Sequence, residues 1–109
     1  MTAIDTILYA LAHPVRREAL RLLGANSEIC LCEFIERLGV PQPNMSRHMS
    51  MLRRAELVLD RKDARWVRYR RNGKMPMKVA RIVDAVINVP EASSLQRAGR
   101  ARAKREIAA

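Results

Sequence analysis

The sequence has few aromatic residues, which limits the core that it can build. Aromatic side chains make up only 4% of the 109 residues, so the core must rely on Leu, Ile, Val, Met and Ala. The length suffices for one domain and not for two. Because so small a core is marginally stable, burying one more helix face between two subunits would strengthen the fold.

Acidic residues are scarce as well. There are 11 Asp and Glu against 21 Lys and Arg, which gives a net charge of +10 and a pI near 11.0. A charge of this sign and size favours a polyanionic partner, either nucleic acid or an acidic membrane surface. Solubility alone rarely needs so much charge of one sign, and we interpret the excess as a sign of nucleic-acid binding.

Long hydrophobic stretches are also missing. No apolar run approaches the roughly 20 residues that cross a bilayer, and the first residues lack the basic and apolar regions of a signal peptide. We therefore expect a cytoplasmic protein with no membrane partner, in a compartment that keeps thiols reduced. The only two cysteines are Cys30 and Cys32. A disulfide between them would close too small a loop to add much stability, and we do not expect a structural one.

Apolar residues recur at helical spacing through the first half of the chain. Pro14 suits the first turn of a second helix. Gly39 suits the end of a third, because Gly readily adopts the left-handed conformation found there. A fourth helix is expected from Pro43 to about Ala55, and helix, short Gly-containing turn and helix form a helix-turn-helix. The four apolar stripes are Ile4, Ile7, Leu8 and Leu11; Val15, Ala19, Leu22 and Leu23; Leu31, Phe34, Ile35 and Leu38; and Met45, Met49 and Leu52.

Two strands and a last helix are predicted after the fourth helix. Residues 57–62 and 66–71 are rich in strand formers, and Val67 and Tyr69 alternate with their neighbours at the strand period of two. We interpret them as a β-hairpin, here called the wing (residues 57–71), with Asp63 to Arg65 as its turn. The last helix starts at Pro76 and has the apolar stripe Val79, Ile82, Val83 and Val86.

The expected fold is mainly α (α+β), a winged helix-turn-helix of about five helices plus one β-hairpin. Residues 1–90 would form the DNA-binding and dimerisation domain. The first and last helices each carry an apolar face that this core does not fully cover, so we predict a homodimer that pairs them. Residues 91–109 would be a basic, frayed tail, with nonspecific DNA contact as a second possibility. Its cations are Arg97, Arg100, Arg102, Lys104 and Arg105.

The fourth helix has a second, largely polar stripe formed by Asn44, Arg47, His48 and Met51. Such a helix can pack on one side and read DNA on the other, and in a dimer two of them would enter successive major grooves of an inverted repeat, about 34–36 Å apart. The alternative is an ordinary solvated face, but a basic wing and the net charge of +10 favour DNA. The candidate base and phosphate contacts are Gln42, Asn44, Ser46, Arg47 and His48 on the helix and Arg61, Lys62, Arg65 and Arg68 on the wing.

Three stretches resemble the ArsR/SmtB family of repressors, in its arsenic-responsive branch. Residues 28–34 (EICLCEF) are similar to the family's ELCVCDL metal box, and residues 42–49 (QPNMSRHM) to the start of its recognition helix. Residues 59–62 (LDRK) and 66–70 (WVRYR) are similar to its wing. The resemblance runs in order through roughly residues 4–88.

The resemblance implies a winged-helix homodimer that binds its operator without inducer and leaves it when a metalloid binds. Cys30 and Cys32 would be the ligands of As(III) or Sb(III), no cofactor would be required, and the target would be a resistance operon that usually includes the repressor's own gene. Ile35 departs from the pattern, because the best-known arsenic repressors have a third cysteine at that place. A solvent oxygen or an external thiol would then complete the site.

The spacing of the two cysteines suggests how such a site would act. Residues two apart lie about 200° apart around an ideal helix, so Cys30 and Cys32 could not reach one ion from a regular helix. We therefore expect the first turn of the third helix to unwind when the ion binds. That distortion would displace the neighbouring helix that reads DNA.

Other functions fit the sequence less well. The family's other sensor, a zinc site on the last helix, would need a His near Asp84, and the only histidines are His13 and His48. An enzyme is not expected, because the Cys-x-Cys lacks the βαβ setting of redoxins and no catalytic triad or phosphate loop is present. A thiol-redox-sensing repressor and an effector-independent DNA-binding protein stay open as alternatives. In the latter the two cysteines would be only small hydrophobes.

Overall fold

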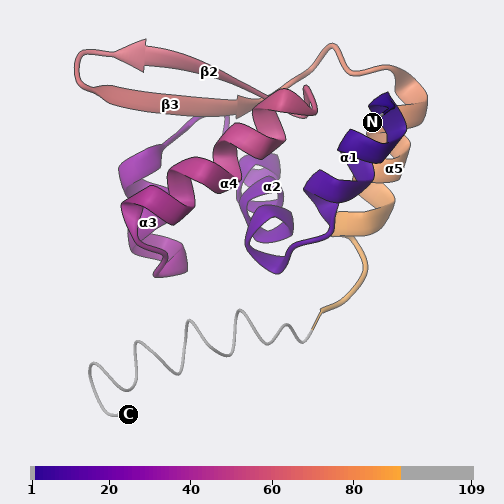
Figure 1. Ribbon diagram of the computed structural model, residues 1–109, viewed down its shortest axis with the longest axis horizontal. Coiled ribbons are helices and arrows are strands. Elements are labelled where there is room, and N and C mark those ends of the chain that lie inside the picture. Colours follow the sequence, from indigo (N-terminus) through magenta and orange to yellow (C-terminus); the bar gives the residue numbers. More distant parts are fainter. Residues whose placement is uncertain (1, 92–109) are drawn as a thin grey trace.

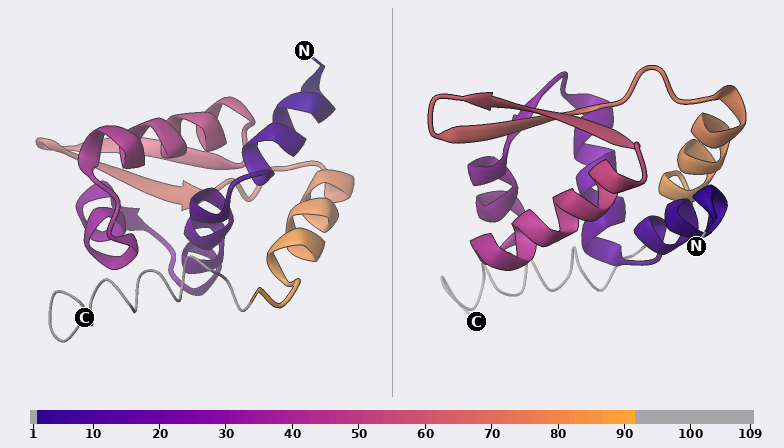
Figure 2. Two further views of the ribbon diagram at one scale, coloured as in Figure 1. Left: turned by 60° about the horizontal axis from the view of Figure 1, so that its bottom comes forward. Right: turned by 45° about the horizontal axis from the view of Figure 1, so that its top comes forward.

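Five helices and a small antiparallel sheet make up the computed structural model, which describes residues 2–91 (Figure 1). The hairpin extends from one end of the helical body, and α1 and α5 lie together at the other end in every view (Figures 1 and 2). The elements are α1 (Ala3–Leu11), α2 (Pro14–Ala25), β1 (Ile29–Cys30), α3 (Leu31–Leu38), α4 (Gln42–Arg54), β2 (Val58–Asp63), β3 (Trp66–Arg71) and α5 (Met77–Ile87).

The first two helices begin at side chains that satisfy free backbone N–H groups. Thr2 and Asp5 form a capping box at α1, in which the Thr2 hydroxyl accepts from the Asp5 N–H at 3.3 Å and the Asp5 carboxylate accepts from the Thr2 N–H at 3.1 Å. At α2 the Nδ1 atom of His13 accepts from the Val15 N–H at 3.1 Å, and Pro14 occupies the first helical position. The break between α1 and α2 is therefore encoded locally.

The predicted helix-turn-helix is confirmed as α3, a short turn and α4. Gly39 ends α3 in the left-handed conformation, with φ of 64°, as its position predicted. The helix α4 begins at Gln42, one residue before the expected Pro43. Met45, Met49 and Leu52 form its fully buried face, so the opposite face is presented to solvent.

The sheet has one strand more than the sequence analysis expected. Strands β2 and β3 form the predicted hairpin, from the pair Val58↔Arg71 to the pair Asp63↔Trp66. The short strand β1 adds to the other edge of β3, so the order is β1-β3-β2. A two-residue strand leaves no alternating pattern in a sequence, and this one was missed for that reason.

Phe34 is at the centre of the core, and its ring meets that of Tyr69 from β3 edge to face, with ring centroids 6.3 Å apart. Val83 on α5 is also fully buried, whereas several large apolar side chains of the terminal helices are exposed within residues 2–91. These exposed side chains are Ile4, Leu8 and Tyr9 on α1, Met77 on α5 and Val89 just after it.

Glu91 is the last residue that the structure describes, and it binds back to the domain. Its carboxylate accepts hydrogen bonds from Arg17 at 2.7 and 3.0 Å and also pairs with Arg21. The first residue of the expected tail is thus held against α2. The tail cations predicted at residues 97–105 lie outside the described residues.

Candidate DNA-binding surface and thiol site

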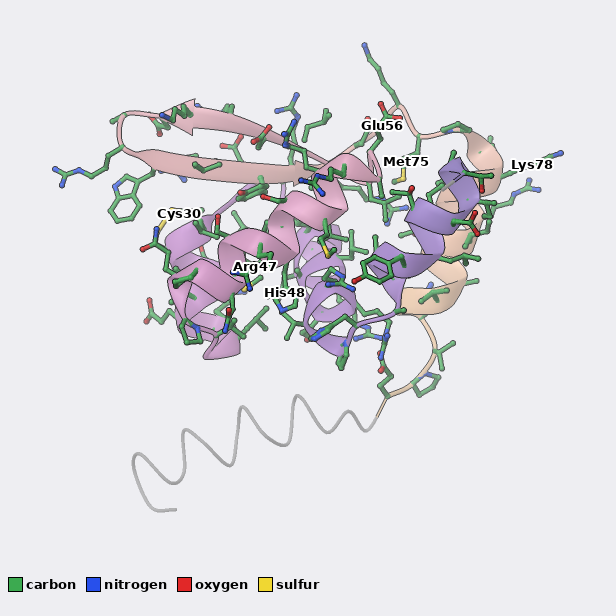
Figure 3. All side chains as sticks on the ribbon, in the orientation of Figure 1. Cys30, Arg47, His48, Glu56, Met75 and Lys78 are labelled. Carbon is green, nitrogen blue, oxygen red and sulfur yellow. A yellow bond between two sulfur atoms is a disulfide. The ribbon has the colours of Figure 1, made fainter. Side chains whose placement is uncertain are left out.

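The solvent-facing side of α4 presents three of the predicted DNA-contacting residues. Gln42, Asn44 and Arg47 are exposed, and Ser46 is half-buried. Arg47 and His48 are adjacent on α4 in Figure 3, where the helix runs along the body of the molecule below the hairpin. Because the apolar face of α4 is anchored by Met45 and Met49, the polar side chains are held on a fixed surface.

His48 differs from these neighbours because its ring contacts another helix of the domain. Its Nδ1 atom lies 3.1 Å from Nη1 of Arg16, and its ring centroid lies 4.3 Å from that of His13. Burial lowers the pKa of His48 to about 4, and the positive fields of His13, Arg16 and Arg47 act in the same direction. The ring is therefore neutral at physiological pH, and one of its two nitrogen atoms is already engaged.

The four wing cations named from the sequence fall into two groups. Arg61 donates two hydrogen bonds of 2.8 Å to Glu28, and Arg68 donates one of 2.9 Å to Asp63. Lys62 and Arg65 are exposed, and within residues 2–91 neither forms an ion pair. Exposed ion pairs contribute little to stability, so a DNA phosphate could compete for the first two cations as well.

The two cysteines converge at the start of α3. Cys30 is the residue that precedes the helix, with extended backbone angles (φ −72°, ψ 146°), and its Sγ atom accepts from the Cys32 N–H at 3.3 Å. The two sulfur atoms are joined as a disulfide, and the Cα atoms are 5.3 Å apart. The Cys30 side chain is buried and that of Cys32 is exposed, so the pair can be reached from one side.

Two expectations about the cysteines were wrong. No structural disulfide was expected, and both residues were taken to lie on one regular helix, which would have separated their side chains. Cys30 belongs to β1, and the change from strand to helix at Leu31 turns its side chain toward that of Cys32. Bringing both sulfur atoms to one ion therefore does not require α3 to unwind.

No third protein ligand lies beside the pair in the described part of the chain. Ile35 is half-buried and packs against the core. Across residues 2–91, no group of three or more His, Cys, Asp or Glu side chains could hold a metal ion. Asp84, the candidate for a zinc site on the last helix, forms an ion pair of 2.8 Å with Arg71. The thiol site thus offers two sulfur ligands from this chain.

The thiol site is linked to both the wing and α4. Cys30 pairs with Arg68 in the β1–β3 ladder, so the strand that holds the buried cysteine is part of the same sheet as the wing. Glu28, two residues earlier, holds Arg61 of β2. Cys32 lies in the first turn of α3, and α3 packs directly on α4. A change at the sulfur atoms therefore reaches the wing and α4 by short routes.

Two residues that contact the candidate site, Glu28 and Arg16, were missed by the sequence analysis. Arg16 could have been found, because it precedes Leu20 and Leu23 by four and seven residues and so lies on a buried helix face. Glu28 carries no such signal, since its partner Arg61 is 33 residues away in the sequence.

No helix within residues 2–91 combines the length and the apolar character that a membrane span requires.

Comparison with known proteins identifies the family. The profile of the "Bacterial regulatory protein, arsR family" matches residues 13–59, from the start of α2 into β2. The chain is 39% identical over 74 residues to an arsenical resistance operon repressor of Escherichia coli, a match that covers 68% of this chain and 63% of that one. It thus spans less than two thirds of that relative. It is 32% identical over 81 residues to an arsenic resistance transcriptional regulator of Pseudomonas putida, covering 74% of this chain and 70% of the other.

The fold agrees with the sequence match. HlyU from Vibrio cholerae superposes with a TM-score of 0.64 at 30% sequence identity, covering 77% of this chain and 87% of that one. The profile match at residues 13–59 includes the helix-turn-helix and the cysteine pair. The chain therefore belongs to the arsR family of bacterial regulatory proteins, which is a family of transcription regulators and not of enzymes.

Proposed function

We propose that this protein is a DNA-binding repressor of a metalloid-resistance operon, and that it leaves its operator when As(III) or Sb(III) binds Cys30 and Cys32. The observation that carries this proposal is the convergence of the two sulfur atoms between the strand that joins the wing and the helix that supports α4. The names of the Escherichia coli and Pseudomonas putida relatives, both concerned with arsenic resistance, support the same inducer. The protein would act in the cytoplasm, where its DNA is found.

DNA binding would use α4 in the major groove and the wing on the adjacent backbone. Arg47 can donate two hydrogen bonds to a guanine edge, and Gln42 and Asn44 can pair with adenine or with phosphate. Lys62 and Arg65 at the wing tip would contact phosphates directly, whereas Arg61 and Arg68 would exchange their carboxylate partners for phosphate. Each phosphate neutralised releases counterions, so the affinity would fall steeply with salt.

A homodimer would place two copies of α4 on an inverted repeat. The exposed apolar residues Ile4, Leu8 and Met77 on α1 and α5 support a dimer built from these helices. Both helices lie at the end of the molecule away from the wing tip, so pairing them would leave the DNA-facing side free (Figure 2).

The inducer would react with the two cysteines as free thiols. A cellular dithiol reductant first reduces the Cys30–Cys32 bond and is itself oxidised. Arsenious acid, As(OH)3, then forms two As–S bonds, and the two displaced hydroxide groups leave as water with the two thiol protons. The third hydroxide stays on arsenic, which supplies the oxygen ligand that Ile35 cannot provide. Soft thiolate ligands favour such an ion over hard cations.

Release from DNA would follow from the position of the sulfur atoms. An arsenic atom between them changes the geometry at the boundary between Cys30 and Leu31. That change acts on β1, which pairs with Arg68, and on α3, which packs on α4. The ion favours whichever arrangement accommodates it, so its differential affinity shifts the population away from the DNA-binding form.

An operator-release assay would test the proposal. A duplex selected by the reduced protein from a randomised library is labelled, and its anisotropy is followed as arsenite, antimonite, cadmium or peroxide is added. We expect arsenite and antimonite to release the DNA at the lowest concentrations. The variant C30S/C32S should bind the same duplex and not respond. An unchanged arsenite response in that variant would contradict the thiol site, and failure of the reduced protein to select any DNA would contradict the repressor.

A thiol-redox sensor is the second candidate, and the joined sulfur atoms favour it. In that case oxidation itself would be the signal. The same assay separates the two candidates. A redox sensor would release DNA when peroxide is added, and it would not release DNA when arsenite is added under reducing conditions.

A further inference from the structure

Arg16 is an almost completely buried cation with 5% of its surface exposed. Two of its nitrogen atoms bind the end of α1: Nε donates to the Ala10 carbonyl at 2.7 Å, and Nη2 donates to the Tyr9 carbonyl at 2.9 Å. The last carbonyl groups of a helix lack partners within the helix, and they attract positive charge. Arg16 therefore caps α1 from the neighbouring helix, and its guanidinium also lies 5.5 Å from the centre of the Tyr9 ring.

The third nitrogen atom of Arg16 contacts α4. Nη1 lies 3.1 Å from Nδ1 of His48 and 3.2 Å from Sδ of Met51, two residues that share one side of that helix. A guanidinium has only donors. Nδ1 of His48 must therefore accept this hydrogen bond, which leaves the ring proton on Nε2.

We propose that Arg16 is a positioning residue for DNA recognition, which fixes α4 relative to the end of α1 by holding His48 as the neutral Nε2–H tautomer. The contact of Arg16 with α1 and with His48 on α4 is here called the junction. His48 then acts through this junction and not by reading a base with Nδ1. The proposal concerns the DNA-binding form alone and is independent of the inducer.

The geometry gives the junction its importance. Nε and Nη2 fix the planar guanidinium against α1, so Nη1 can meet His48 in only one orientation. Base edges are read by side chains at hydrogen-bond distances, so a small rotation of α4 would remove several contacts at once. A lysine at position 16 has a single nitrogen and could not hold both helices.

The charged groups around His48 also favour its neutral form. Arg16 faces the ring from α2, His13 faces it from the residue that precedes α2, and Arg47 is its neighbour on α4. The positive charge of Arg17 likewise lowers the pKa of His13 and so favours its neutral form. A proton on Nδ1 would point at the Arg16 guanidinium, which has no acceptor. The junction therefore exists only while Nδ1 carries no proton.

Arg17 provides a matched control. It is the next residue on α2, and it also caps α1, donating to the Leu11 carbonyl at 2.8 Å, but its other hydrogen bonds are to Glu91 and not to α4. Losing Arg17 therefore removes a partly buried cap of α1 without removing the contact to His48.

The first test is the DNA affinity of four variants at pH 7.5, on a duplex selected by the wild-type protein, with thermal unfolding to establish that each is folded. We expect R16K and H48A to lose about tenfold or more in affinity, as for a lost hydrogen bond to a charged group. H48Q, whose amide oxygen can still accept from Arg16, should stay within about threefold of wild type, as should R17K. The double variant R16K/H48A should bind no more weakly than the worse single variant.

The second test is the tautomer itself, from the 15N shifts of the His48 ring. We expect the Nε2–H form in the wild type with no titration between pH 8 and 5, and a mixture of tautomers in R16K. An Arg16 that served only to cap α1 would not change this signal. An Nδ1–H ring in the wild type, additive losses in the double variant, or an H48Q protein as weak as H48A would each overturn the proposal.

Discussion

Glu28 and Arg61 form a two-point ion pair, with both oxygen–nitrogen distances 2.8 Å, between the segment that leads to Cys30 and the strand β2 of the wing. The contact holds a wing cation beside the thiol site. It also occupies a guanidinium that a phosphate could otherwise bind, so in the proposed DNA complex Glu28 would compete with a phosphate for Arg61.

The variant E28Q should therefore bind DNA more tightly than the wild type in the absence of inducer. Arg61 becomes available to a phosphate, and the surface loses one negative charge, so we expect a gain of about two- to fivefold and a steeper fall of affinity with salt. Fluorescence anisotropy between 50 and about 300 mM salt measures both. E36Q is the control, because Glu36 is exposed on α3 and forms no ion pair within residues 2–91. An equal gain in E36Q would assign the effect to net charge.

Acid should destabilise the fold through His48. Its pKa is lowered from 6.5 to about 4, chiefly by burial. Between these values the unfolded chain binds a proton that the folded protein does not, so the free energy of unfolding decreases as the pH falls from about 6.5 towards 4. Urea unfolding at pH 7, 6 and 5 should show this decrease, and H48Q should show a smaller one. Some slope should persist in H48Q because burial also lowers the pKa of His13. If the free energy of unfolding decreased equally with pH in the wild type and in H48Q, the effect could not be assigned to His48.

Removing the carboxylate of Glu91 should loosen the segment that follows α5. Hydrogen bonds from Arg17 and Arg21 lower the pKa of Glu91 to about 2. The stabilisation is therefore present above the ordinary value of 4.5 and is lost as the pH falls towards 2. At neutral pH we expect E91Q to cost about 1 kcal/mol, the upper range for partly exposed pairs. That corresponds to a decrease of about 4–8 °C in Tm for a domain of this size. The difference from wild type should shrink in high salt, whereas a salt-independent loss would argue for packing.

Trp66 gives an intrinsic signal for DNA binding by the wing. It is the only tryptophan of the chain, and 47% of its surface is exposed where β3 begins, next to Arg65. If the wing tip meets DNA, the indole exchanges water for sugar or base, and its emission should decrease or shift to shorter wavelength. A fluorescence titration with the selected duplex measures this change. W66F should bind with similar affinity but give no signal, and an unchanged wild-type emission under saturating DNA would place the wing tip away from the duplex.

Local patterns in the sequence were sufficient for most of the fold. Gly39 ended α3 as expected, and the stripe of Met45, Met49 and Leu52 was buried. These features depend on residues a few positions apart, where spacing alone indicates the face of a helix. The wing followed from alternation of the same local kind.

The candidate site was less predictable because it depends on contacts between distant residues. Arg16 meets His48 across 32 residues, and Glu28 meets Arg61 across 33. Neither contact leaves a periodic pattern. The conclusion about the cysteines failed for another reason: it assumed a regular helix at Cys30, where the backbone is still extended. A one-residue error in a helix boundary was enough to reverse the expected direction of a side chain.

The central position of β3 determines what kind of motion the thiol site can cause. Ile29 pairs with Tyr69, whose ring packs on Phe34. The residues on either side of Tyr69 in β3 are arginines. Sliding β1 by one residue would exchange its own two faces and turn the buried side chain of Ile29 away from the aromatic core. Other registers are therefore unfavourable for β1, which either stays paired with β3 as observed or detaches from it. Because only two residues must be released, detachment needs little change, and the response to the signal should be all-or-none in each chain.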